Sequence, residues 1–72
     1  MMNVLKLKGK IVENGYTTEG FAKAINMDHS TLYRKLRREG TSFTVGEANM
    51  IVKALGLSSE DAVAIFFAES VA

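Results

Sequence analysis

Residues 18–36, with the sequence TEGFAKAINMDHSTLYRKL, are the part of this chain that most restricts its fold. Apolar residues with helical spacing stand on both sides of a three-residue break at positions 26–28: Phe21, Ala22 and Ile25 precede it, and Leu32 and Leu36 follow it. This pattern predicts two short helices joined by a tight turn. Polar and basic residues fill the other side of the second helix, so we expect that side to be exposed.

The rest of the chain also has helical periodicity and little of the alternation that is typical of strands. With 72 residues, 47% of them apolar and none of them proline, the chain suits one small folded domain that covers residues 1–72. We therefore predict a compact all-α domain of five helices. The expected spans are Asn3–Asn14, Thr18–Ile25, Asp28 to Arg38 or Glu39, Thr44–Leu55 and Ser58–Phe67.

Capping residues support these boundaries. Side chains that suit an N-cap occur at four helix starts, namely Thr17, Asp28, Thr44 and Ser58. Thr44 and Glu47 have the spacing of a capping box, and Ser58 and Asp61 resemble one with Asp in place of Glu. Residues that tolerate a left-handed backbone follow three of the helices, at Gly15, Asn26 and Gly56.

The first helix is predicted to bury a stripe of aliphatic side chains. The expected stripe consists of Val4, Leu7 and Ile11, widened by Leu5 and Val12. Gly9 costs about 1 kcal/mol relative to alanine in a helix interior, and a close contact with another helix would explain its presence.

The residue inventory excludes several classes of site. The chain has no cysteine and one histidine, His29, so we expect neither a disulfide nor a zinc site, and no cofactor. A serine nucleophile would need His29 as its base, and no glycine-rich phosphate loop is present, so we do not expect an enzyme. The longest apolar run, at 62–68, is too short to span a bilayer, and the lysines at 6, 8 and 10 interrupt any signal-peptide core. We expect a cytoplasmic protein.

The net charge of +1 hides a strong asymmetry along the chain. Residues 1–38 carry eight basic and three acidic side chains, which gives +5, whereas residues 39–72 carry one basic and five acidic side chains, which gives −4. A split of this kind indicates that the first half faces a polyanion.

Six residues between positions 17 and 32 have a spacing that resembles the helix-turn-helix of the lambda-repressor and Cro family: Thr17, Thr18, Ala22, Asn26, Met27 and Leu32. The stretch 30–36 and the positions Phe43, Thr44, Glu47, Ile51, Leu55 to Leu57 and Ile65 to Phe67 look like small phage-type members. The resemblance implies a five-helix lambda-repressor-like domain with its helix-turn-helix in helices two and three. It also implies that the chain regulates transcription, as a phage or mobile-element repressor, by binding double-stranded DNA.

Two positions depart from the family pattern. Asn26 stands where many members have glycine, and Lys35 stands in a turn that is often apolar, with Leu36 after it. The second departure leaves the choice of base-facing residues open by about one position.

Within this resemblance the second motif helix, at about 28–38, enters the major groove of DNA. Ala22 is small where the two helices cross, Met27 fills the corner, and Leu32 anchors the second helix. The outward side is then made of His29, Ser30, Tyr33, Arg34 and Arg37. The family's base-contacting positions correspond to His29, Ser30 and Arg34, and Tyr33 lies beside them, suited to a thymine methyl group or a phosphate. Arg34 suits bidentate bonding to guanine, although it could also contact a phosphate or simply be solvated.

Further residues are candidates for phosphate contact. They are Lys35, Arg37 and Arg38 in the basic run, Thr17 and Thr18 at a helix start, and Thr41, Ser42 and Thr44 in the loop after the third helix. The basic run could equally form a solvated helix face, and the threonines could serve only as N-caps. The lysines at 6, 8 and 10 would add long-range attraction or simply form a solvated face.

Phe66 and Phe67 are adjacent, so a helix cannot bury both equally. We expect one to pack in the core and the other to contribute to a homodimer contact through the C-terminal helix, because DNA sites read in this way usually have two halves. The alternative is a monomer in which both rings are partly buried. Two rival functions remain: a protein-interaction module, such as an antirepressor or antitoxin, and a non-specific architectural DNA binder.

Overall fold

The computed structural model of the chain describes residues 2–37 and 43–67, and the expected residues Arg38, Thr41 and Ser42 lie outside this part. Within it, five helices and no strand occur. Their bounds are α1 Val4–Glu13, α2 Thr18–Ala24, α3 His29–Arg37, α4 Val45–Leu55 and α5 Ser59–Phe66. The predicted all-α fold is therefore confirmed. None of these helices is long and apolar enough to cross a bilayer.

The helix starts follow the predicted caps. Thr17 Oγ1 accepts the Gly20 amide at 3.0 Å, and Asp28 Oδ2 accepts the Ser30 amide at 3.0 Å. Thr44 and Glu47 form a complete capping box at the start of α4. These bonds satisfy amide groups that a helix leaves without a partner in its first turn, which explains why the helices begin where they do.

Residues with a left-handed backbone follow three of the helices, α1, α2 and α4. Gly15, Asn26 and Gly56 have φ angles of 82°, 56° and 60°. At Asn26 the turn is closed by two amides, since Met27 N donates to Ala22 O at 2.8 Å and Asn26 N donates to Lys23 O at 3.1 Å. This Schellman pattern reverses the chain between α2 and α3 within a few residues, as the sequence predicted.

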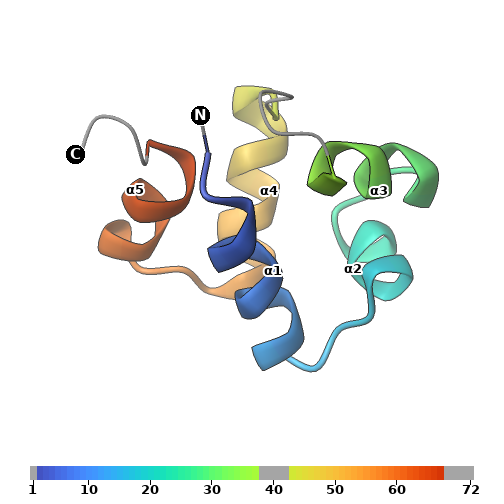
Figure 1. Ribbon diagram of the computed structural model, residues 1–72, viewed down its shortest axis with the longest axis horizontal. Coiled ribbons are helices and arrows are strands. Elements are labelled where there is room, and N and C mark those ends of the chain that lie inside the picture. The colour runs from blue at the N-terminus through green and yellow to red at the C-terminus, as the bar shows by residue number, and fades with distance from the viewer. Residues whose placement is uncertain (1, 38–42, 68–72) are drawn as a thin grey trace.

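The five helices enclose one apolar core. Its buried residues are Leu7, Ile11, Phe21, Ala22, Ile25, Leu32, Leu36, Ile51, Leu55 and Ile65. Helix α2 packs against α3, and α1 packs against both α3 and α5. Figure 1 shows α1 and α4 in the middle of the molecule, with α5 on one side and α2 and α3 on the other. No buried polar or charged residue occurs in the described ranges, so apolar packing alone fills the interior.

Two expectations for α1 were wrong. Leu5 and Val12 are 80% and 72% exposed instead of widening the buried stripe. They are seven residues apart, so they share one side of the helix, while Leu7 and Ile11 turn toward α3 and α5. Gly9 has no atom within 4 Å of the position where a Cβ would stand, so no close helix contact explains it.

Candidate nucleic-acid interface

One side of α3 forms a shallow hollow of about 410 Å³. Its lining consists of His29, Ser30, Tyr33, Arg34 and Arg37, which are the five residues expected on the outward side of this helix. All five are exposed. Leu32 and Leu36 on the opposite side are 0% and 4% exposed, so the burial of these leucines fixes the rotation of the helix. The structure thereby shows which residues of α3 are exposed, with Leu36 in the core.

The neighbouring helix holds α3 in this orientation. Ala22 on α2 is 1% exposed and lies in the same buried cluster as Leu32. The small side chain at this position is consistent with the predicted close crossing of α2 and α3, which pack against each other. The hollow is therefore carried on a helix that is anchored by the core rather than on a loop.

The hollow is positively charged. Among the described residues, neither Arg34 nor Arg37 forms an ion pair, so no nearby carboxylate neutralises the two guanidinium groups. Both lie in the last turn of α3, where cations also interact favourably with the helix dipole. An exposed guanidinium pair next to hydroxyl and imidazole groups is suited to an anionic, hydrogen-bonding partner.

Lys35 departs from the expected arrangement. Its Nζ lies 3.4 Å from Glu47 Oε1 and 5.4 Å from the centroid of the Phe43 ring, and its side chain is only 16% exposed. Because Leu36 occupies the core position, Lys35 falls at the border between α3 and α4. Lys35, a candidate for phosphate contact in the sequence, thus lies apart from the exposed Arg34 and Arg37.

Glu47 joins two interactions at this border. Its Oε1 accepts the Thr44 amide at 2.8 Å in addition to facing Lys35. The Thr44 amide lowers the pKa of the Glu47 carboxyl most, the nearby Lys35 lowers it further, and burial opposes both effects. Glu47 is thus held as a carboxylate that connects α3 to the first turn of α4.

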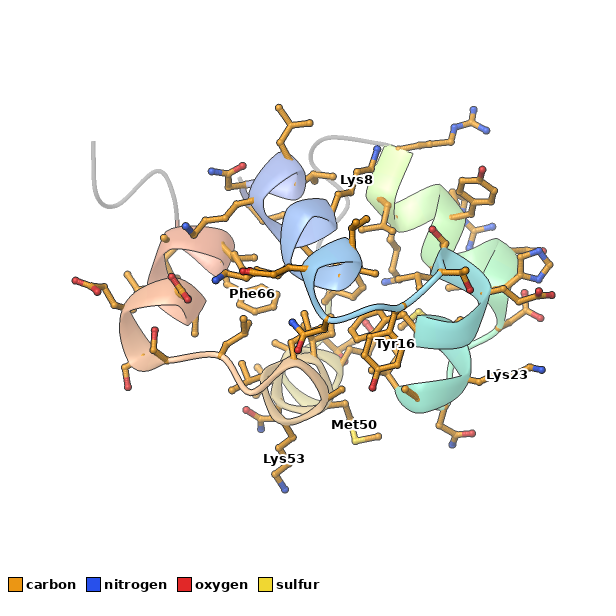
Figure 2. The ribbon with its side chains drawn as sticks, turned by 90° about the horizontal axis from the view of Figure 1, so that it is seen from below. Lys8, Tyr16, Lys23, Met50, Lys53 and Phe66 are labelled. Atoms are coloured by element: carbon orange, nitrogen blue, oxygen red, sulfur yellow. The ribbon has the colours of Figure 1, made fainter. Side chains whose placement is uncertain are left out.

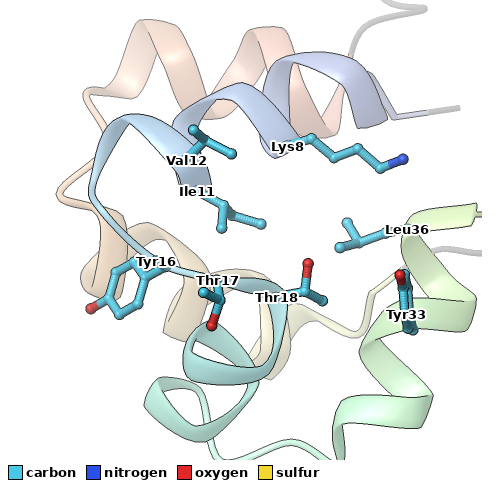
Figure 3. Close-up of a pocket in the computed structure, with 8 residues that line it drawn as sticks. All are labelled: Lys8, Ile11, Val12, Tyr16, Thr17, Thr18, Tyr33 and Leu36. Atoms are coloured by element: carbon cyan, nitrogen blue, oxygen red, sulfur yellow. The ribbon is translucent and has the colours of Figure 1, made fainter.

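The threonines of the expected phosphate set have different surroundings. The hydroxyls of Thr17 and Thr44 act as N-cap acceptors. Thr18 instead lines a groove of about 380 Å³ between α1, α2 and α3 (Figure 3). The groove also contains Lys8 and Tyr33, and the buried residues Ile11 and Leu36 contribute to its lining. Tyr33 lines both this groove and the hollow on α3, so the two lie next to each other.

The three lysines of α1 do not form one face. Lys6 and Lys10 approach Asp61 on α5, at 3.7 and 3.1 Å, while Lys8 lies on the side of α1 next to α3 (Figure 2). The hydrogen bond between Lys10 and Asp61 raises the pKa of Lys10 and lowers that of Asp61. The sequence already indicates this arrangement. Lys6 and Lys10 are four residues apart and so lie on the same side of the helix, whereas Lys8 is two residues from each and lies on the opposite side.

The two C-terminal phenylalanines have separate roles. The Phe66 ring meets Phe43 edge-on, with centroids 6.4 Å apart, and it packs against the core. Phe67 is 61% exposed, and Val63, one turn earlier on α5, is 45% exposed. Of the two expected dimer contacts, only Phe67 has a largely exposed side chain.

Comparison with protein-family models found no matching family, and comparisons with curated proteins and with solved structures found no significant match.

Proposed function

We propose that this chain is a sequence-specific, double-stranded DNA-binding transcriptional regulator of the phage-repressor type. In this proposal α2 and α3 form a lambda-repressor-like helix-turn-helix, and α3 enters the major groove. The observation that carries it is the continuous, exposed row of His29, Ser30, Tyr33, Arg34 and Arg37 on a core-anchored helix. A helix that presents donors, an imidazole and two arginines on one side fits the width and the chemistry of the major groove.

The proposed roles follow the position of each residue along α3. His29, Ser30 and Tyr33 occupy the N-terminal part of α3 and contact base edges, and Arg34, which begins the last turn on the same exposed side, reaches a base edge with its long side chain. Arg37 stands at the last turn and contacts a phosphate. Thr17 and Thr18 stand at the start of α2 and Thr44 at the start of α4, where their hydroxyl protons add phosphate contacts. Lys35 is assigned no DNA contact in this scheme.

The regulator is proposed to bind as a homodimer. Val63 on α5 and Phe67, the residue that follows α5, lie one turn apart and are both exposed, which supports pairing through this end of the chain. Two copies related by a two-fold axis would present two α3 helices to the two halves of a symmetric DNA site.

Selection of bound sites from random duplex DNA tests the proposal. We expect an enriched site with two-fold symmetry, and a binding constant that falls steeply as salt is added. The variant Ser30→Ala together with Arg34→Ala should lose the enriched site while keeping the fold, because both side chains are exposed. Equal affinity for all duplexes would instead indicate an architectural DNA binder.

The competing function is a protein-interaction module such as an antirepressor or antitoxin. The exposed Val63 and Phe67 on an acidic half of the chain are the observation that favours it. Failure to bind pooled duplex DNA at low salt would support this function and overturn the DNA-binding proposal.

A further inference from the structure

We propose that Lys8 on α1, together with Tyr33 and Thr18, binds a phosphate of the DNA backbone in the groove between α1, α2 and α3. This inference rests on the proposed DNA-binding function and extends its contact surface to a helix outside the helix-turn-helix. The groove has a volume of about 380 Å³ and opens beside the hollow on α3, with Tyr33 as the shared wall (Figure 3).

Of the three lysines on α1, Lys8 is the one without a nearby carboxylate among the described residues, so its ammonium group can bind a phosphate. Lys6 approaches Asp61 at 3.7 Å and Lys10 approaches Asp61 at 3.1 Å and Glu13 at 3.5 Å, whereas Lys8 has no ion pair in the part of the chain that the structure describes. Its side chain is exposed and borders a second surface depression together with Arg37. The cationic surface of α3 therefore extends onto α1 at Lys8, which lies next to Tyr33 and Arg37.

The chemistry of the lining suits a sugar–phosphate unit better than a free anion or an apolar ligand. The ammonium group of Lys8 and the hydroxyls of Tyr33 and Thr18 are donors for phosphate oxygens. The remaining lining is largely aliphatic, from Ile11, Val12 and Leu36, and an aliphatic surface can contact the carbon face of a deoxyribose. An acidic peptide is the other class of partner that would use a lysine beside aliphatic residues, and its binding is one outcome of the test.

The test compares Lys8→Gln with Lys53→Gln, which removes the same charge from an exposed position on α4, at the opposite edge of the molecule in Figure 2. Binding of a selected duplex site is measured by fluorescence anisotropy over a range of salt concentrations. Each phosphate contact contributes a slope of about 0.9 in the plot of log affinity against log salt. Lys8→Gln should therefore lower the slope by about 0.9 and the affinity about eightfold at about 0.1 M salt. Lys53→Gln should leave the slope unchanged, and Lys8→Arg should restore it.

A second measurement identifies the contacted atom. A single uncharged methylphosphonate replaces one phosphate of the selected site at a time. At one position this replacement should weaken DNA binding by the wild type and leave binding by Lys8→Gln unchanged. Wild-type binding with equal slopes for Lys8→Gln and Lys53→Gln would overturn this inference alone. Binding of an acidic peptide that Lys8→Gln abolishes, with DNA binding intact, would also overturn it. Failure of the wild type to bind any duplex would overturn the proposed function as well.

Discussion

Glu47 connects α3 to α4, and replacing it tests how firmly α3 is held. Glu47 Oε1 accepts the Thr44 amide at 2.8 Å and lies 3.4 Å from Lys35 Nζ. Glu47→Ala removes both contacts and takes the carboxylate away from Lys35, whose side chain is 16% exposed. Glu47→Gln is the matched variant, because a glutamine can still accept the Thr44 amide but carries no charge.

The expected loss of stability follows from these two contacts. Loss of a capping interaction costs about 1 kcal/mol. Removal of one partner of an ion pair costs about 0.2–1 kcal/mol at an exposed site and about 3–5 kcal/mol at a buried site. The Glu47 side chain is 30% exposed, which lies between these limits. We expect a total of about 2 kcal/mol for Glu47→Ala and about 0.5–1 kcal/mol for Glu47→Gln.

The contribution of the charge has a defined pH dependence. The Thr44 amide, and to a smaller extent Lys35, hold the pKa of Glu47 below its unfolded-state value of about 4.3. A lowered folded-state pKa stabilises the fold above the unfolded-state value, and this stabilisation is lost as the pH falls through the folded-state value. The stability difference between the wild type and Glu47→Gln should therefore shrink as the pH falls from about 5 through the folded-state pKa of Glu47.

Urea denaturation followed by far-ultraviolet circular dichroism measures the free energy of unfolding of the three proteins. The reasoning fails if Glu47→Ala unfolds at the same urea concentration as the wild type at neutral pH. It also fails if the difference between the wild type and Glu47→Gln is the same in acid as at neutral pH.

Three further outcomes are expected. Gly9→Ala should raise the free energy of unfolding by about 1 kcal/mol in urea denaturation, because a Cβ at Gly9 meets no atom within 4 Å; an unchanged or lowered value would contradict this. Ala22→Leu should lower the melting temperature, with overpacking costing about 1–3 kcal/mol at a position that is 1% exposed; an unaltered melting curve would show that α2 and α3 are loosely packed. Arg34→Ala should relax preference at one base pair of the selected site, worth about 1–3 kcal/mol, whereas Arg37→Ala should weaken all sites alike; identical selected sites for Arg34→Ala and the wild type would refute the assignment.

The fold was predictable because its local signals agree with one another. Thr17, Asp28 and Thr44 mark helix starts by their hydrogen-bonding side chains, and Asn26 marks a helix end by its tolerance of a left-handed backbone. Each of these signals depends on residues within four positions of one another. The outward row on α3 was equally local, since the burial of Leu32 and Leu36 determines which residues remain exposed.

The errors concern contacts between helices that are distant in the sequence. The direction of the Lys35 side chain depends on Glu47 and Phe43, which lie in and just before α4, and no periodicity within α3 reports their position. The exposure of Leu5 and Val12 depends on where α3 and α5 pack against α1. The side of α1 on which Lys8 lies follows from helical geometry alone. The groove that Lys8 lines with Tyr33 exists only because α1 and α3 lie side by side.

The side chains that line the hollow on α3 take no part in the buried core. Under the proposed function, a combinatorial library that varies positions 29, 30, 33, 34 and 37 would therefore alter DNA recognition on an unchanged scaffold. Single substitutions at such exposed positions usually change the free energy of unfolding by about 0.5 kcal/mol or less. In the proposed function, target preference would thus be free to diverge while the interior of the domain stays constant.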